Sequence, residues 1–581
     1  MINILGIHLS HNSAVCLMQD GKIVAATHQE RFSRSKNDGG FSKEGIDWIL
    51  KTFNINPMDI DAVAVGGKEI LPVNIEPVSA GTNNKDNVPF NTKMWRYIDY
   101  RHQKLRKLFY PLVMKKRHKN TEVGRKQLVE TIKRIYGIPA AKIFFVDHHT
   151  CHAYTAYYGL REKENSTIVL TLDGEGDEVC ATVNTANGEI KRISTTPWYK
   201  SLGYIYSQTT TYLGMKALEH EYKVMGLAPY AKDYFIEVYK QLYEPVINID
   251  ENTLEFSSKF PTNRFITHLK ENAQGQRFDN IAASVQHLTE TLVTKWIRAA
   301  AEKLELEELY LGGGVFMNVK LNLKLSELDE VKDMHPFPSC GDESNPFGAA
   351  YYVYINNFSK PASDLKRIKD LYLGPKYSNE DVEHIIKKLD LKRRFRVEFY
   401  KDIEGIVADL LAKGKVVARL DGKSEWGARS LGNRAILGNP STMEVFYKVN
   451  DQIKMRDFWM PFAPTILKER ESEYIENPKN IEAPYMIMAF HSKPLAQKEL
   501  VAAIHQADKT CRPQILEKDW NQKYYKIIKE FQNETGIGGV LNTSFNLHGE
   551  PMVLSPEDAI HTLENSGLEY VAIENYLISK K

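Results

Sequence analysis

Cysteine is scarce in this 581-residue chain, which has five of them: Cys16, Cys151, Cys180, Cys340 and Cys511. Their odd number, their wide scatter and the lack of a C-x-x-C pair exclude a disulfide framework and a cysteine-based zinc ribbon. Long apolar runs are also missing, since no stretch reaches the roughly 18 residues of a membrane-spanning helix. The N-terminus lacks the basic residues and the unbroken apolar run of a signal peptide. We therefore expect a soluble, cytoplasmic protein with no membrane partner.

An excess of charge of one sign is missing as well. The chain has 76 Lys and Arg against 74 Asp and Glu, for a formal net charge of +2. This balance gives no overall attraction to nucleic acid or to anionic membranes. The 43% of hydrophobic and 10% of aromatic residues exclude a disordered chain, and the length favours more than one hydrophobic core.

Two segments, 2–30 and 166–195, follow the same pattern. Each has three short β-rich runs, with a polar loop after the first run. A tight turn, Asp20-Gly21 or Asn187-Gly188, stands before the third run. Two unrelated meanders would give the same pattern, so a duplicated fold is one hypothesis and not the only one.

Between these segments lies a Lys- and Arg-rich stretch, 92–137, with helical character. It could contact an acidic partner or nucleic acid, but a solvated helical face is the interpretation that we favour. Residues 281–305 have the apolar spacing of a core helix. A Pro- and Ser-containing stretch at 357–378 predicts a domain boundary. A second α/β unit follows, with a helix predicted at 402–414 and a strand at 538–543.

The segment DHHTCH at 147–152 has the spacing of a metal site. If it begins a helix, His148 and His152 lie at i and i+4 on one face. Imidazoles with a carboxylate suit Fe(II), Mn(II) or Zn(II). Asp173 and Asp342 each follow an apolar run, and either could complete the site. An H-x-x-x-H pair is common, so ordinary helix histidines are the alternative.

Glycines and cations indicate phosphate binding. The run Gly312-Gly313-Gly314 follows an apolar stretch and precedes a helical pattern, where bare backbone can approach a phosphate. A tight strand–helix turn would need the same glycines. In the second unit five cations stand among glycine and turn residues: Arg429, Arg434, Lys454, Arg456 and Arg512. Arginine forks match phosphate oxygens, whereas a surface salt bridge is the alternative for any one of these cations.

No serine or cysteine lies in a nucleophile-elbow or triad context, so covalent catalysis is not favoured. The polar run NTSFN at 542–546 follows a buried-type strand and could orient a small polar acyl group. The residues by themselves indicate a two-module enzyme that handles phosphates, and they leave a metal open.

Several segments taken together resemble the NodU/CmcH family of O-carbamoyltransferases, which includes the tobramycin and cephalosporin carbamoyltransferases. The matching segments run in family order over nearly the whole chain: LGIHLSHNSA, QERFSRSKND, VDHHTCHA, LDGEGDE, EYKVMGLAPYA, LYLGGGVFMN, WGARSLGNRAIL, FWMPFAP and NTSFNLHGEP. The resemblance implies two α/β domains joined by a linker at 358–378. Residues 1–357 would form a duplicated actin/sugar-kinase-like domain, similar to that of the threonylcarbamoyl transferases. Residues 379–581 would form a YrdC-like domain.

The same resemblance implies an ATP-dependent carbamoyltransferase. The second domain would combine carbamoyl phosphate and ATP into carbamoyl-adenylate and release pyrophosphate. The first domain would transfer the carbamoyl group to a hydroxyl of a small natural-product acceptor and release AMP. Fe(II) is the implied metal, with another divalent ion as the alternative, and Mg would accompany ATP. The resemblance names no acceptor, and it leaves a homodimer open.

Residue roles follow from the resemblance position by position. The metal ligands would be His148, His152, Asp173 and Asp342. The catalytic residues would be His11, as the candidate base, with Arg429 and Lys454 at the phosphate. Contacts to substrate or nucleotide would come from Lys36, Gly313, Gly314, Asn318, Arg434, Arg512, Ser544 and Asn546.

Two positions depart from the family pattern. Asn12 follows His11 where the family usually has Asp, and the segment HQADKTCRPQ around Arg512 carries an extra residue. Two other functions compete with the main hypothesis. A tRNA threonylcarbamoyl-type transferase has only the basic stretch 92–137 in its favour, so nucleic acid is not an expected partner. A sugar-kinase-like phosphotransferase would leave the histidine pair unexplained.

Overall fold

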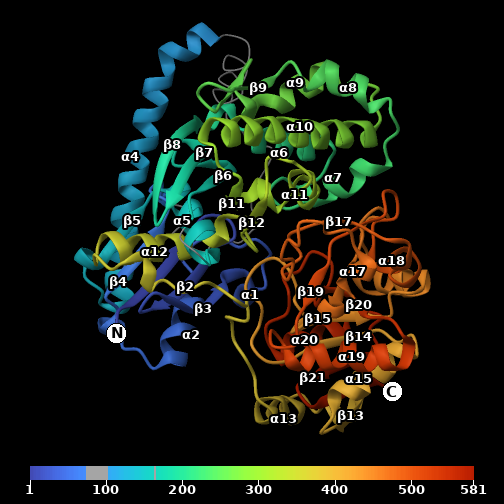
Figure 1. Cartoon of the computed structure of the whole chain (residues 1–581). Helices are drawn as coiled ribbons and strands as arrows, with labels where there is room; N and C mark the ends of the chain where they lie inside the picture. The colour runs from blue at the N-terminus through green and yellow to red at the C-terminus, as the bar shows by residue number, and fades with distance from the viewer. Residues whose placement is uncertain (73–102, 163–164) are drawn as a thin grey trace. The chain divides into compact units, whose positions relative to one another are not determined.

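The chain folds into two compact units (Figure 1). The computed structural model describes residues 1–72, 103–162 and 165–581, with side chains from residue 114 onward in the second range. Unit 1 consists of Met1–Glu30 and Asn37–Lys369, and unit 2 consists of Arg31–Lys36 and Asp370–Lys581. A short piece of the N-terminal sequence therefore belongs to unit 2, which sequence continuity does not predict.

Unit 1 contains two five-stranded sheets with one topology. The first sheet has the order β3-β2-β1-β4-β5 and the second has the order β8-β7-β6-β11-β12. In each, the central strand pairs antiparallel with one neighbour and parallel with the other. The strands are β1 (Asn3–His8), β2 (Ala14–Gln19), β3 (Lys22–His28), β4 (Ala62–Gly66), β5 (Ile143–Val146), β6 (Thr167–Gly176), β7 (Val179–Asn187), β8 (Glu189–Pro197), β11 (Glu308–Gly312) and β12 (Asp333–Pro336). The equal order and directions confirm the predicted duplication and the α/β, actin/sugar-kinase-like fold.

Two helices pack against each other in the layer that joins the halves of unit 1. Helix α5 (His148–Leu160) follows β5 but packs on the second sheet, against β6 and β11. Helix α12 (Asn345–Asn356) follows β12 but packs on the first sheet, against β1 and β4. A Cβ atom at Gly348 would collide with the carbonyl oxygen of Cys151, so this glycine permits the close approach of the helices. The first turns of α5 and α12 are therefore held near the ends of both central strands.

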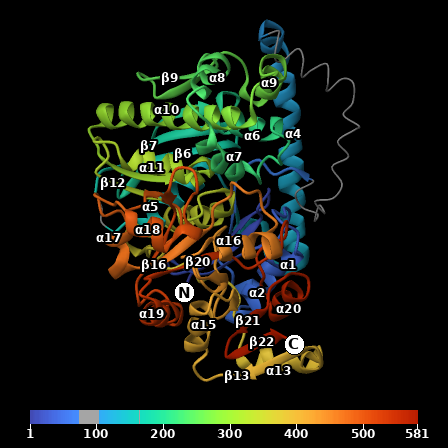
Figure 2. The ribbon, with the colours of Figure 1, turned by 90° about the vertical axis from the view of Figure 1, so that its right-hand side faces the viewer.

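The remaining helices of unit 1 cover the outer faces. Helix α2 (Lys43–Phe53) and the end of α4 (Gln103–Tyr136) bury apolar residues against the first sheet. Of the basic stretch 92–137, residues 92–102 lie outside the described residues, and most of the rest forms α4. The helix predicted at 281–305 is confirmed as α10, which packs among α6, α7, α8 and α11 (Figure 2). These elements and their neighbours are α1 (Gln29–Ser33), α6 (Leu202–Tyr212), α7 (Glu221–Leu227), α8 (Phe235–Leu242), β9 (Ile247–Asp250), β10 (Glu255–Ser258), α9 (Phe265–Asn272), α10 (Phe278–Leu304) and α11 (Val319–Ser326).

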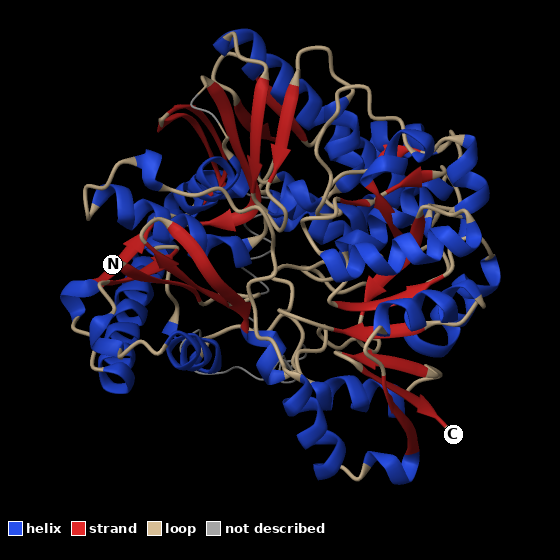
Figure 3. Cartoon of the chain, turned by 60° about the horizontal axis from the view of Figure 1, so that its bottom comes forward, coloured by secondary structure: helices blue, strands red, loops and turns tan. Residues whose placement is uncertain are grey.

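Unit 2 is built on an eight-stranded mixed sheet in the order β13-β22-β21-β14-β15-β20-β16-β19. The predicted helix at 402–414 and strand at 538–543 are confirmed as α15 and β20. Figure 3 shows its strands and the helices that accompany them. The strands are β13 (Phe395–Phe399), β14 (Val417–Leu420), β15 (Arg434–Gly438), β16 (Ala463–Leu467), β19 (Gln514–Leu516), β20 (Gly539–Ser544), β21 (Tyr570–Ile573) and β22 (Tyr576–Lys580). The longer helices are α13 (Asn379–Lys388), α15 (Ile403–Ala412), α16 (Met443–Val449), α19 (Gln522–Thr535) and α20 (Pro556–Glu564).

Two expectations about the whole chain can be compared with the fold. All five cysteines are buried and none forms a disulfide bond, and burial raises the pKa of Cys511 to about 12, so this side chain stays a thiol. Among the described residues, no helix combines the length and the apolar character that crossing a membrane requires.

Candidate functional site

The predicted histidine pair lies on the first turns of α5. Asp147 is the N-cap of this helix, because its carboxylate accepts a hydrogen bond of 2.8 Å from the backbone N–H of Thr150. The helix therefore begins at His148, and His152 follows one turn later on the same face. Their Nε2 atoms lie 3.1 Å apart. Both side chains are buried.

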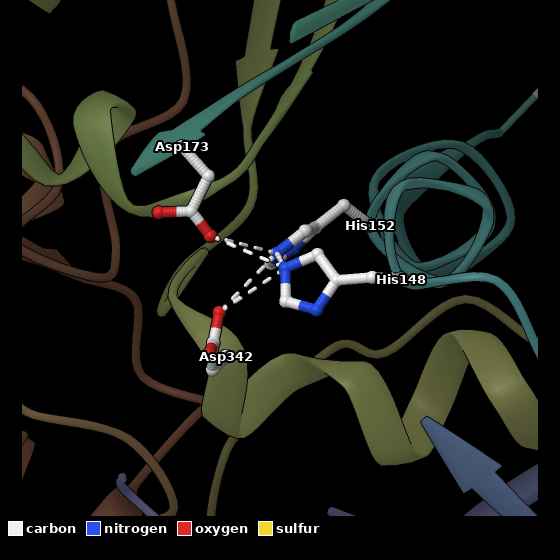
Figure 4. Close-up of side chains that lie close together, drawn as sticks. All are labelled: His148, His152, Asp173 and Asp342. Carbon is white, nitrogen blue, oxygen red and sulfur yellow. Dashed lines mark hydrogen bonds and ion pairs between the residues drawn. The ribbon is translucent and has the colours of Figure 1, made fainter. Parts of the chain in front are cut away.

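Two carboxylates from distant segments face this pair (Figure 4). Asp173, near the end of β6, places Oδ2 at 3.3 Å from both Nε2 atoms. Asp342, directly before α12, places Oδ1 at 3.4 Å from His148 and 3.6 Å from His152. One ligand atom from each of the four residues lies within 4.8 Å of all the others. The structure thus brings together all four residues that the sequence singled out as candidate ligands.

The donor set fits a divalent cation. Two imidazoles and two carboxylates are a common combination for Fe(II), Mn(II) and Zn(II). A metal-bound histidine needs an acceptor for its other ring N–H, and Asn345 supplies one. Its side-chain amide lies 3.3 Å from His148 Nδ1. The Oδ1 atom of Asn345 is buried and has no partner among the described residues, so a turned amide would accept the Nδ1–H. Ser344 Oγ lies 3.5 Å from Nδ1 of His152.

The cluster carries strong electrostatic coupling. Burial lowers the pKa of His148, but the carboxylates of Asp342 and Asp173 outweigh burial and raise this pKa to about 10. Burial and Asp342 raise the pKa of Asp173, but both imidazoles outweigh them and lower it to about 2. The pKa of His149 falls to about 3 through burial and the two neighbouring histidines. His149 Nε2 donates to the backbone carbonyl of Val179 at 3.0 Å, and Nδ1 lies 2.7 Å from the Thr171 hydroxyl, so this side chain supports the strands rather than the cluster.

Three residues of the first loop surround Asp342. His11, the predicted base, places Nδ1 at 3.7 Å from Asp342 Oδ2, and its side chain is 39% exposed. His8 Nε2 lies 3.5 Å from the same oxygen, and the Ser10 hydroxyl donates to it at 3.2 Å. The sequence analysis did not single out His8 and Ser10. The sequence could have indicated His8 and Ser10, because both are polar residues at or just after the end of an apolar strand.

A third missed residue, Asp177, fixes the segment directly after β6, the strand that carries Asp173. Its carboxylate accepts backbone N–H groups from Lys68, Glu69 and His148 at 2.7 to 2.9 Å. This one side chain therefore joins the end of β4, the start of α5 and the loop after β6.

The predicted nucleotide contacts of unit 1 lie beside the metal cluster. Gly313 has a φ of 97°, and a Cβ atom there would collide with Leu172. A Cβ atom at Gly314 would stand 3.1 Å from the Asp173 carboxylate. Asn318 is engaged in the fold, because its amide accepts from Leu321 N–H at 3.0 Å and donates to Gln286 at 2.8 Å.

In unit 2, Lys454 is a buried cation. It lies at the end of a π-helical turn, and its ammonium donates to the carbonyl of Ser544 and to Asn546 Oδ1 at 2.7 Å. Among the described residues no carboxylate pairs with Lys454 or with Arg512. Burial, Arg456 and Lys36 lower the pKa of Lys454 well below its usual value. The charged form of Lys454 is therefore disfavoured here unless an anion offsets the charge.

Arg512 belongs to the same group of cations. Its pKa is lowered through burial, Arg429 and Arg456, so three guanidinium groups gather here. The predicted residues Arg429, Lys454, Arg512, Ser544 and Asn546 therefore form one cluster, here called the cation cluster, and Arg456 and Lys36 lie beside it. The sequence analysis noted Arg456 among the cations but assigned it no contact.

Arg434 lies in a different environment. It is fully buried, and its guanidinium donates to backbone carbonyls, among them those of Asp421 at 3.0 Å and Leu554 at 3.3 Å. This geometry favours a role in holding loops together over direct contact with a substrate. The cluster of cations in the sequence could not show that Arg434 is buried, because burial depends on the tertiary fold.

Two family profiles match the chain. The profile described as Carbamoyltransferase N-terminus matches residues 3–351, and the one described as Carbamoyltransferase C-terminus matches residues 408–580.

Individual relatives match over most of their length. A protein of Synechocystis sp. is 30% identical across 100% of this chain and 97% of its own. The 3'-hydroxymethylcephem-O-carbamoyltransferase of Amycolatopsis lactamdurans is 23% identical across 78% of this chain and 83% of its own. Component A of the (R)-2-hydroxyglutaryl-CoA dehydratase of Acidaminococcus fermentans is a solved structure with 15% identity, a TM-score of 0.33, and coverage of 62% of this chain and 100% of its own. With a family profile matching more than half of its length, this chain belongs to the carbamoyltransferase family of enzymes, the NodU/CmcH family whose motifs it carries.

Proposed function

We propose that this enzyme transfers the carbamoyl group of carbamoyl phosphate to a hydroxyl of a small natural-product acceptor, with consumption of ATP. Family membership supports the carbamoyl chemistry. The observation that carries the use of two phosphate substrates is the cation cluster of unit 2. Lys454 and Arg512 stand there with no carboxylate partner among the described residues, as expected where polyanions bind.

Activation would take place in unit 2, as a YrdC-like domain. Water would add to the carbamoyl carbon of carbamoyl phosphate, and inorganic phosphate would leave with the electrons of the broken C–O bond, which gives carbamate. An oxygen of the resulting carbamate would then bond to the α-phosphorus of ATP, and pyrophosphate would leave with the electron pair of the broken P–O bond. Arg429, Lys454 and Arg512 offset the phosphate charge, while Ser544 and Asn546 offer polar groups that orient the carbamate. Lys36 would add a further cation at the nucleotide phosphate, and Mg would accompany ATP.

Transfer would take place in unit 1. His11 is suited to accept the proton of the acceptor hydroxyl, because its side chain is partly exposed and its Nδ1 lies 3.7 Å from the carboxylate of Asp342, beside the candidate metal ligands. The hydroxyl oxygen would bond to the carbamoyl carbon, and AMP would leave with the electrons of the broken C–O bond. Gly313, Gly314 and Asn318 would face the nucleotide. An Fe(II) or similar ion held by His148, His152, Asp173 and Asp342 would act as a Lewis acid toward the carbamoyl carbonyl.

The acceptor is proposed as a class. The cephem carbamoyltransferase among the relatives is named for a hydroxymethyl acceptor. A primary or ring hydroxyl on a small metabolite is therefore the proposed acceptor.

The test is a product analysis. Incubated with carbamoyl phosphate and ATP, the purified protein should release pyrophosphate, and it should release AMP when an acceptor hydroxyl or water takes the carbamoyl group. Arg429→Ala should lower the rate of pyrophosphate release by a factor on the order of 100. Arg394→Ala is the matched control, because Arg394 pairs with Glu564 in the same unit, outside the cation cluster. Formation of ADP by the wild-type protein would contradict the proposal.

A further inference from the structure

The segment Arg31–Lys36 is fastened to unit 2 by two arginines. Arg31 is buried, and its Nη2 donates to the carbonyl of Gly427 at 2.9 Å. Arg34 places its two terminal nitrogens on adjacent carbonyls, with Nη1 at 2.8 Å from Met552 and Nη2 at 3.0 Å from Pro551. Both arginines thus bind backbone of loops that carry predicted substrate contacts.

Two carboxylates also hold the guanidinium of Arg34. Its guanidinium lies 3.6 Å from the carboxylate of Glu550 and 3.4 Å from that of Asp558. Asp558 also accepts from the backbone N–H of Ser555 at 3.0 Å in the capping box of α20. The backbone of Arg34 has a φ of 60°, a left-handed conformation that a side chain of this size rarely adopts without such contacts. Arg34 is therefore fixed more firmly than an ordinary surface arginine.

A short network leads from Arg34 to Lys454. Glu550, which faces Arg34, accepts a hydrogen bond of 2.8 Å at its carbonyl from Asn546 Nδ2. The Oδ1 atom of the same Asn546 accepts from Lys454 at 2.7 Å. His548 lies between these contacts, with Nδ1 at 3.0 Å from the Lys454 carbonyl. The loop 546–552 therefore holds Lys454 at one end and is gripped by Arg34 at the other.

Lys36 comes two residues after Arg34 in the same segment of unit 2. Two peptide units span at most ~7 Å, so an arginine fixed at residue 34 limits the position of residue 36. The Lys36 charge also acts on Lys454, whose pKa it helps to lower. Positive charges at Lys36 and Lys454 would both attract an anion that binds in unit 2.

We propose that Arg34 is a positioning residue of the cation cluster: it fixes the loop 546–552 that holds Lys454, and it places Lys36 beside Lys454. The inference rests on the proposed activation of carbamoyl phosphate and ATP in unit 2. Arg34 itself contacts protein groups only in its described interactions, so its effect on chemistry passes through the two lysines. If Arg34 only stabilised the fold, its substitution would lower the melting temperature, and its effect on activity would not depend on whether Lys36 is present.

The experiment is a double-mutant cycle on the full chain, read out as pyrophosphate release from carbamoyl phosphate and ATP. The variants are Arg34→Met, Lys36→Met and the double variant, with Arg34→Lys as a milder change that keeps the charge but loses the two-carbonyl fork. Arg394→Met is the control, since Arg394 also combines an ion pair, to Glu564, with a hydrogen bond to a carbonyl, Leu389, at 3.2 Å. Melting temperatures of all variants are measured alongside.

We expect Arg34→Met and Lys36→Met each to lower kcat/KM by roughly 10- to 100-fold, as small displacements of charged groups do in active sites. Arg34→Lys should lower kcat/KM by about 10-fold. The kcat/KM of the double variant should lie within about 3-fold of that of the less active single variant. The reason is that both substitutions disturb the same function, so the second one adds little. Arg394→Met should retain wild-type activity.

Two results would overturn the inference. One is that Arg34→Lys stays within about 2-fold of wild type, and the other is that the effects of Arg34→Met and Lys36→Met simply multiply. Failure of the proposed function looks different, because the wild-type protein would then release no pyrophosphate. In that case calorimetric titration with ATP still decides the role of Arg34, and equal dissociation constants for wild type and Arg34→Lys would refute it.

Discussion

Asp173 and Asp342 set the charge balance of the candidate metal centre. Together they bring two negative charges into a buried site, which is costly unless cations offset them. The carboxylates favour positive charge beside them, which raises the pKa of both His148 and His152 although burial lowers it. A divalent ion would supply two positive charges and leave both rings neutral. The residues are therefore matched in number to one doubly charged cation.

Removal of one donor should release the metal. Protein purified without oxygen should contain close to one equivalent of metal, measured by elemental mass spectrometry, and His148→Ala should lose most of it. Asn345→Ala keeps all four donors but removes the acceptor beside His148 Nδ1, so its affinity should fall only by roughly 10- to 100-fold. His384→Ala, a change at an exposed position of α13 in unit 2, is the control. Full metal content in His148→Ala would contradict the ligand assignment.

At the residue scale, the sequence predicted what local spacing and motif order encode. The i, i+4 spacing of His148 and His152 requires only a helix, and a helix is present. The closeness of Ser10 to Asp342, 332 residues further on, comes from the packing of α12 on the first sheet. Arg434 is a second case, since the local sequence shows a cation among glycines, whereas its burial and its backbone carbonyl partners come only from the fold.

At the scale of elements, α4 extends the candidate transfer site. Arg117, in the middle of α4, binds Glu69 and Glu175 with its guanidinium, and Tyr204 donates to the other oxygen of Glu175. His118, the next residue, lies 2.6 Å from Glu178. The helix that the sequence marked only as basic thus holds the loop that begins at Asp173.

Arg117→Ala should therefore damage transfer more than activation. It leaves Glu69 and Glu175 without their cation, and Glu69 has a pKa that burial already raises. We expect a loss of about 1–3 kcal/mol of stability and a lower rate of acceptor carbamoylation, with pyrophosphate release unchanged. Calorimetry and the two product assays measure this. Lys126→Ala, at an exposed position of α4, is the control. A parallel loss of both activities would argue against a role confined to the transfer site.

A pH-dependent contact joins the strands that lead to the glycine run. His335 of β12 lies 3.4 Å from both Glu308 and Asp333, and its side chain is 25% exposed. Burial lowers its pKa, but these carboxylates outweigh burial and raise it to about 9.

His335→Gln should therefore destabilise the protein in one pH window. An imidazole with a folded-state pKa above its unfolded value of about 6.5 stabilises fully below that pH and loses its contribution as the pH rises through 9. Allowing for solvent screening, we expect His335→Gln to cost about 1–2 kcal/mol at pH 6 and almost nothing at pH 10. Chemical unfolding at both values measures it. A cost that is equal at the two pH values would show that the charge is unimportant.

At the scale of the whole molecule, the repeated hairpin turns predicted the duplication, because Asp-Gly and Asn-Gly turns fix local pairing. The parallel strands β4, β5, β11 and β12 complete both sheets through long crossovers, so their partners could not be read from local patterns. The membership of Arg31–Lys36 in unit 2 was also hidden. It depends on contacts such as that of Arg34 with Met552, which are 518 residues apart in sequence.

The proposed division of the two reactions between the units leads to the last prediction. Lys454→Met removes a buried charge from the cation cluster and replaces it with an apolar side chain of similar length, so the fold should tolerate it. This variant should release no pyrophosphate and form no carbamoylated product.

His152→Ala removes a candidate metal ligand from unit 1. It should still release pyrophosphate, at a rate within about 3-fold of wild type, while product formation falls by a factor on the order of 100 or more. Mass spectrometry of the acceptor and a pyrophosphate assay on the same samples separate the two steps. If His152→Ala loses pyrophosphate release as completely as Lys454→Met does, the reactions are not divided in this way, and both clusters would have to serve a single step.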